Sequence, residues 1–167
     1  MRTQHSLLTL AISSIIAVGG GLSTAAQAVV PTSTSAVDTD EHGLAMQGYD
    51  AVAYFTEGAP HQGNPKFKVM QGGATYYFAS AANMKRFKKN PSAYLPQYGG
   101  FCAMGTSLHQ KFEGDPKVWH VVDNKLYLNV NQDVDRRWGD DVPTNITHAN
   151  ENWPEIKGKT PAELEKQ

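Results

Sequence analysis

The chain has 167 residues, of which 40% are hydrophobic and 19% are charged, and its formal net charge is −1. The near-neutral charge excludes the basic footprint of a nucleic-acid-binding domain.

The first 28 residues have the features of a cleavable signal peptide. Arg2 precedes an apolar stretch over residues 7–22, and Ala26-Gln27-Ala28 fits the small-x-small pattern of a cleavage site. The apolar stretch is shorter than the roughly 20 residues that a membrane-spanning helix needs. We therefore expect export to the periplasm or outside of a bacterial cell, with no stable membrane anchor after cleavage. Removal of Arg2 leaves 14 basic against 16 acidic side chains, a balance of −2.

The remaining chain divides by composition into three parts. Residues 29–45 are rich in Thr, Ser, Asp and Ala without an apolar period, which predicts a flexible leader. Residues 46–156 carry the apolar patterns of one small domain, and residues 157–167 form a charged tail with few side chains to bury. The domain has room for a single hydrophobic core.

Three short strands are predicted in the first half of the domain. Residues 51–55 form an apolar run, residues 66–70 alternate, and residues 74–78 follow the turn signal Gly72-Gly73. The last two of these segments are expected to form an antiparallel hairpin.

Ser80 is a suitable N-cap for a helix over residues 81–89, with Met84 and Phe87 directed toward the core. The same helix carries a basic run, Lys85, Arg86, Lys88 and Lys89. Such a run is either a solvated helix face or a patch for phosphate or a membrane, and its helical spacing favours the solvated face.

A second hairpin is predicted from residues 118–122 and 125–130, because Asp123-Asn124 between them is a tight-turn signal. Before it, the Gly99-Gly100 pair indicates either positive φ or a close backbone approach just ahead of Cys102.

Two helices are predicted after this hairpin. Asn131 can cap a helix that ends at Gly139, and residues 143–152 form a last helix closed by Trp153-Pro154. The predicted fold class is α+β, with a small antiparallel sheet of about five short strands in two hairpin regions and three to four short helices.

Several segments together resemble the YHS domain, in its exported stand-alone branch. The resemblance extends over the whole expected domain. It rests on the segments Gly48-Tyr49-Asp50-Ala51-Val52-Ala53-Tyr54, Tyr76-Tyr77-Phe78-Ala79-Ser80, Asn90-Pro91-Ser92-Ala93-Tyr94, Tyr98-Gly99-Gly100-Phe101-Cys102-Ala103 and Asn152-Trp153-Pro154.

The resemblance implies a soft-metal site in other members of the family, where three cysteines supply thiolates. Those cysteine positions correspond here to Ala53, Ala79 and Asn83, and none of the three carries sulfur. Since a soft-metal site depends on thiolates, the family's site does not transfer to this chain.

Cys102 is the only cysteine, which is unusual for an exported domain because such domains generally pair their cysteines in disulfides. Some exported members of this branch are selenoproteins, and the resemblance implies that their selenocysteine corresponds to Cys102. That correspondence would make the position chemically important.

One hypothesis is a soft-metal site. Cys102, Met104 and His109 lie within eight residues and offer a thiolate, a thioether and an imidazole, a donor set that suits a copper ion, Cu(I). His61 and His120 are possible additional ligands if the fold brings them near.

Two other interpretations stay open. Cys102 is a redox nucleophile or peroxide sensor, or it is a small buried hydrophobe in a structural or partner-binding domain. The leading prediction is a non-enzymatic binding module for a soft metal ion centred on Cys102.

Overall fold

The structure is a computed structural model that describes residues 36–166, so the signal peptide predicted for residues 1–28 lies outside the described residues. The first half of the fold contains two strands and two α-helices: α1 (Ala53–Thr56), β1 (Asn64–Gln71), β2 (Ala74–Phe78) and α2 (Ala81–Lys89). The second half contains α3 (Ala103–Ser107), β3 (Asp115–Val122), β4 (Lys125–Asn129), α4 (Gln132–Asp140), α5 (Val142–Ile156) and α6 (Pro161–Leu164). Three short 3-10 segments complete the described elements: η1 (Met46–Gly48), η2 (Pro91–Ala93) and η3 (Gln97–Gly100).

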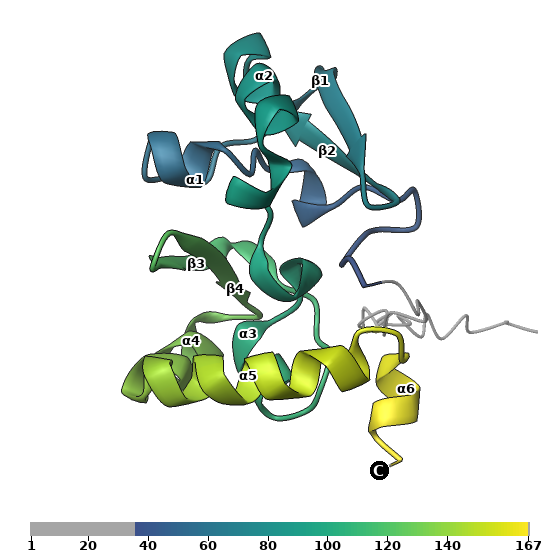
Figure 1. Cartoon of the computed structure of the whole chain (residues 1–167), viewed down its shortest axis with the longest axis vertical. Coiled ribbons are helices and arrows are strands. Elements are labelled where there is room, and N and C mark those ends of the chain that lie inside the picture. The colour runs from purple at the N-terminus through teal and green to yellow at the C-terminus, as the bar shows by residue number, and fades with distance from the viewer. Residues whose placement is uncertain (1–35, 167) are drawn as a thin grey trace, which may run out of the picture.

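The two halves lie one above the other in Figure 1, each built on one β-hairpin. β1 pairs with β2, and β3 pairs with β4, both antiparallel. Asp123 and Asn124 in the second hairpin have φ of 49° and 57°, the left-handed conformation that a tight hairpin turn requires. Both predicted hairpins are confirmed.

The α+β class is confirmed, but the expectation of one sheet with about five strands is wrong. Residues 36–166 contain four strands in two separate two-stranded sheets. The missing strand is the run 51–55, which forms a turn at residues 51–52 and continues as helix in α1. The Asp50 Oδ1 accepts a hydrogen bond from the Val52 N–H at 2.8 Å, and the Asp50 backbone carbonyl accepts one from the Ala53 N–H. This side-chain turn starts a helical turn where hydrophobicity alone suggested a strand.

Residues 36–166 contain six α-helices, more than the three to four expected. Ser80 and Asn131 cap α2 and α4 as predicted, each accepting a hydrogen bond from the backbone N–H three residues later. The last predicted helix is longer than expected, because α5 continues through Pro154 to Ile156, whose side chain is fully buried. Burial of that last turn outweighs the hydrogen bond lost at the proline.

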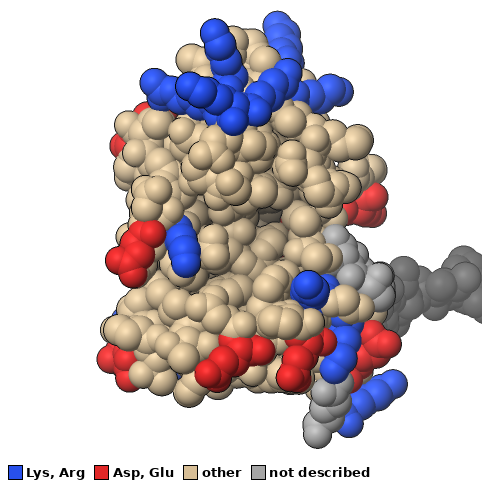
Figure 2. Space-filling view, viewed as in Figure 1, with Lys and Arg blue, Asp and Glu red and all other residues tan. Residues whose placement is uncertain are grey.

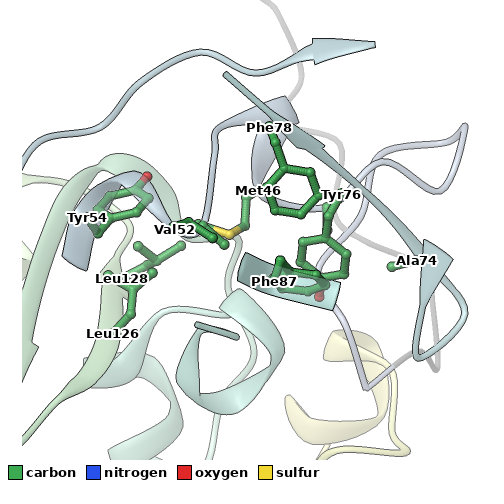
Figure 3. Packing of buried hydrophobic residues seen from close by; sticks show 11 residues of the cluster. Met46, Val52, Tyr54, Ala74, Tyr76, Phe78, Phe87, Leu126 and Leu128 are labelled. Carbon is green, nitrogen blue, oxygen red and sulfur yellow. The ribbon is translucent and has the colours of Figure 1, made fainter. Parts of the chain in front are cut away.

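β4 is buried on both faces and joins the two halves. Leu126 and Leu128 face the larger hydrophobic cluster, beside Val52 and Tyr54 (Figure 3). Tyr127 faces the opposite way, into a second cluster with Tyr98, Ala103, Trp138 and Ala149. The alternation of a strand thus supplies both cores from five residues.

Residues 36–45 and 157–166 pack against the domain more closely than their polar composition suggests. In the segment assigned to the leader, the N–H of Asp38 donates to the Gly99 carbonyl at 2.9 Å, and Ala45 is buried. Gly99 has a φ of 65°, and a Cβ there would collide with the carbonyl of Ala36. The expected positive φ and the expected close approach therefore both occur at this glycine.

The segment assigned to the charged tail also packs. Lys111 donates from Nζ to the carbonyls of Lys157 and Lys159 at 3.2 and 2.9 Å, and Leu164 in α6 is buried. The contacts of one lysine and one leucine therefore order a segment that is otherwise polar. No helix in the described part of the chain is both long enough and apolar enough to cross a membrane.

Asp38, in the N-terminal part of the described chain, is expected to make the stability of the protein depend on pH. Burial raises the pKa of Asp38 to about 7 from 3.8, assisted by Glu113, while the Gly114 N–H and Lys111 oppose the shift. Because the folded state holds this proton more tightly than the unfolded state, the stabilising effect is full below pH 4 and is lost as the pH rises toward 7. Asp38→Asn removes the charge and keeps an acceptor for Gly114.

We expect Asp38→Asn to match the wild type near pH 4 and to become the more stable protein as the pH rises through about 7. Urea unfolding of both proteins across this range measures the difference. A stability difference between the two proteins that stays constant with pH would contradict the raised pKa of Asp38.

Candidate functional site

Cys102 is fully buried at the N-terminal end of α3. Its Sγ accepts a hydrogen bond from the Gly105 N–H at 3.4 Å and donates one to Asn129 Oδ1 at 3.5 Å. Its own N–H donates to the Phe112 carbonyl at 2.9 Å. The thiol is thus an N-cap for a short helix, held on both sides by the protein.

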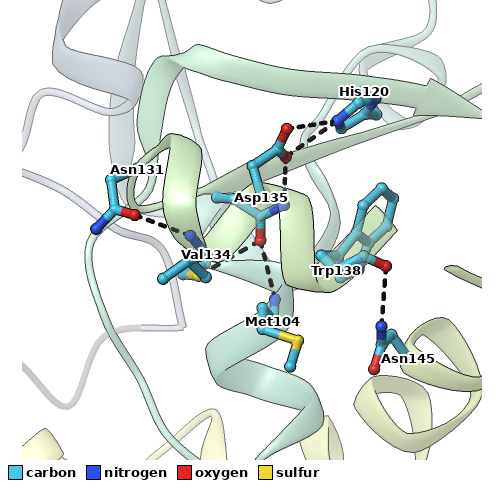
Figure 4. A network of polar contacts seen from close by, with 9 residues as sticks. Met104, His120, Asn131, Val134, Asp135, Trp138 and Asn145 are labelled. Atoms are coloured by element: carbon cyan, nitrogen blue, oxygen red, sulfur yellow. Dashed lines mark hydrogen bonds and ion pairs between the residues drawn. The ribbon is translucent and has the colours of Figure 1, made fainter. Parts of the chain in front are cut away.

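Asn129 connects three elements through one buried side chain. Its Oδ1 accepts from the Met104 N–H at 3.0 Å, and its Nδ2 donates to Asp135 Oδ1 at 2.8 Å. Asp135 in turn pairs with His120 Nε2 at 2.9 Å (Figure 4). A continuous chain of hydrogen bonds therefore runs from the buried Cys102 to the exposed His120.

The environment of Cys102 disfavours its charged form. Burial raises the pKa of the Cys102 thiol above its ordinary value, and the opposing N–H groups of Gly105, Val130 and Met104 do not cancel this effect. The nearby carboxylate of Asp135 raises it further. Since the thiolate is the nucleophile and the metal ligand, the site keeps the sulfur in its less reactive form at neutral pH.

The predicted ligands are engaged with different partners. Met104 Sδ accepts from the Ser107 hydroxyl at 3.7 Å, and His109 Nε2 lies 3.4 Å from Glu155. His61 lies in the other half of the fold, where its Nε2 is 3.2 Å from Glu57.

Of the three predicted histidines, His120 is the one that a chain of hydrogen bonds joins to Cys102 within residues 36–166, by way of Asp135 and Asn129. Within residues 36–166, no group of three or more His, Cys, Asp and Glu side chains is placed to hold a metal ion.

A second buried polar centre lies where the family resemblance places thiolates. Asp50 is fully buried, and its Oδ2 accepts from the Ala79 N–H and from Asn83 Nδ2, both at 2.8 Å. Its carbonyl accepts from the Ala53 N–H. The three positions without sulfur, Ala53, Ala79 and Asn83, are thus all hydrogen-bonded to Asp50, which links α1 to the start of α2.

Sequence reasoning did not identify Asn129 and Asp135. The usable signal was an asparagine in an otherwise apolar strand, because a polar side chain in a buried strand needs a partner. The identity of that partner depends on how α4 folds back onto β4, which no local pattern encodes.

Three hollows on the surface are lined by other residues. A hollow of about 340 Å³ is bordered by Tyr98 and Trp153, among other side chains. A second, of about 210 Å³, shares Trp153, and a third, of about 140 Å³, is bordered by Asp38 and Glu113. Cys102 lines none of these three hollows.

Loss of the Asp50 side chain is expected to destabilise the protein strongly. Asp50→Ala leaves the buried Val52 N–H and the Ala79 N–H without their acceptor and takes the nearer of two acceptors from Asn83, and we expect a loss of about 3 kcal/mol or more in the free energy of unfolding. Glu57→Gln is a matched control, because Glu57 also accepts from Asn83 but its side chain is 43% exposed. We expect a loss of less than about 1 kcal/mol for the control. Urea unfolding measures both variants. Similar losses of unfolding free energy in the two would show that Asp50 does not hold α1 against the start of α2.

Comparison with known proteins gives one match. The family model of the YHS domain matches residues 52–98, a range that contains the positions Ala53, Ala79 and Asn83 and ends before Cys102. The resemblance seen after Tyr98 lies outside this match. Neither the curated proteins nor the solved structures include a match to the chain. The comparison therefore supports a YHS domain over residues 52–98 of this chain, from the residue before α1 to Tyr98.

Proposed function

We propose that this chain is an exported, non-enzymatic YHS-domain protein that binds a partner through its surface, and that Cys102 has a structural role. The observation that carries the proposal is the complete burial of Cys102, with its Sγ held between the Gly105 N–H and Asn129 Oδ1. A side chain in that position has no contact with solvent, and it already spends its hydrogen-bonding capacity on the fold.

A redox role for Cys102 has less physical support. Burial raises the pKa of the thiol, so the nucleophilic thiolate is scarce at neutral pH. The sequence has no second cysteine to resolve an oxidised sulfur. Turnover would need an external thiol as reductant, together with an opening of α3 to expose the sulfur.

A soft-metal site is the second candidate, with copper as the ion. In its favour, Cys102 and Met104 lie at the start of the same short helix, so two sulfur-bearing side chains belong to one turn. Binding would require Cys102 to lose its proton and its bond to Asn129, and His109 to leave Glu155. These costs weigh against tight binding in the folded state.

Two substitutions separate the structural role from thiol chemistry. Cys102→Ser keeps an N-cap acceptor for Gly105 and a donor for Asn129, so we expect the free energy of unfolding to change by less than about 1 kcal/mol. Cys102→Ala removes the cap and leaves a small cavity, and we expect a loss of about 1 to 3 kcal/mol. Urea unfolding under reducing conditions measures both.

A copper titration tests the metal site against the structural role of Cys102. Reduced wild type and Cys102→Ser are titrated with Cu(I) in competition with a chelator of known affinity. We expect the two proteins to compete equally weakly. Wild-type protein that takes Cu(I) from the chelator while Cys102→Ser does not would overturn the structural assignment and support the metal site.

A further inference from the structure

The basic side chains of this chain are strongly segregated. Residues 58–112 contain seven Lys and Arg and no Asp or Glu, whereas residues 113–167 contain seven Lys and Arg against eleven Asp and Glu. The fold collects six of the first group on β1 and α2, and we name this surface the basic pole. Its members are Lys66, Lys68, Lys85, Arg86, Lys88 and Lys89.

Figure 2 shows the basic pole as a group of cations at one end of the molecule, with acidic side chains below it and most of them toward the opposite end, where a few basic side chains also lie. All six cations are exposed. Within residues 36–166, none of their side chains has an ion pair or a hydrogen bond. Like charges gathered without ion-pair partners repel one another. The helix dipole offsets this repulsion for Arg86, Lys88 and Lys89 in the last turn of α2, but not for the cations outside that turn.

The sequence alone favoured a solvated helix face, because the four cations of α2 have helical spacing. The structure adds Lys66 and Lys68 from β1, a separate element beside that helix. Met70 follows them on the same face of the strand and is 77% exposed. A patch that draws on two elements and includes an exposed apolar side chain goes beyond one solvated helix face.

We propose that the basic pole docks the protein onto the anionic headgroups of a phospholipid bilayer. The cations project outward, and no Lys or Arg lines the three hollows described above. Such a convex surface does not enclose a small anion. Five of the six cations are lysines, whose flexible stems suit dispersed phosphates better than a planar, bidentate site.

The uneven distribution of charge over the molecule also favours a flat bilayer over a nucleic acid as the partner of the basic pole. A bilayer contacts one pole only, so the acidic side chains on α4 and α5 point away from it. A long nucleic acid that wraps the domain would meet those acidic side chains. Attraction of clustered lysines to anionic lipid falls off within a Debye length, which limits it to the near pole.

The test is cosedimentation of the exported chain with vesicles of phosphatidylglycerol and phosphatidylcholine in equal amounts, and with vesicles of phosphatidylcholine alone. The test variant replaces the four cations of α2 by Gln, which keeps helix propensity: Lys85→Gln, Arg86→Gln, Lys88→Gln and Lys89→Gln. The control variant changes net charge equally at exposed sites outside the basic pole: Lys117→Gln, Lys125→Gln, Arg137→Gln and Lys166→Gln.

We expect the test variant to bind the anionic vesicles at least about tenfold more weakly than the wild type, and the control variant to stay within about threefold of it. Binding should be lost in high salt and absent with neutral vesicles. Equal weakening by both variants, equal binding to neutral vesicles, or tighter binding to a single-stranded oligonucleotide than to anionic vesicles would overturn the proposal. If the test variant does not fold, Lys66→Gln with Lys68→Gln on β1 replaces it, with the same expected direction.

Discussion

The first half of this fold depends on a single buried carboxylate. Asp50 receives hydrogen bonds from Val52, Ala79 and Asn83, and so fixes the start of α1 against the junction of β2 and α2. A buried anion is stable only when donors surround it, and here two backbone groups and one amide fulfil that requirement. The YHS domain match begins two residues after Asp50 and contains its three donors. The Asp50 carboxylate bonds Ala79 and Asn83, and the Asp50 backbone carbonyl bonds Ala53, so one residue joins the three positions at which the resemblance places metal-binding thiolates.

The second half uses the same physical solution at Asn129. This amide binds α3 through the Cys102 Sγ and the Met104 N–H, and it binds α4 through Asp135. β4 carries Asn129 on a strand whose other residues supply both hydrophobic clusters. The thiol is therefore part of the packing between β4, α3 and α4, and the chemistry of the protein is expected at its surface.

Local signals predicted the parts of the fold that local interactions determine. Ser80 and Asn131 cap their helices because a short polar side chain before an amphipathic run has one preferred use. The run 51–55 was misassigned because a short apolar segment fits a buried strand or a buried helical turn equally well. The partnership of Asn129 with Cys102 spans 27 positions, and it depends on tertiary packing that no spacing reveals. The sequence marked the lone cysteine as a candidate, but its burial and its partners decide its role.

The most direct test of this account is the rate at which an alkylating reagent modifies Cys102 in the folded protein. If the thiol is a structural cap, modification occurs only through opening of the domain. The rate should then be at least about a thousandfold below that of the unfolded chain and should rise with urea in parallel with global unfolding. Modification in native buffer at a rate near that of a free thiol, with an apparent pKa at or below about 8.5, would contradict the account and favour a chemical role for Cys102.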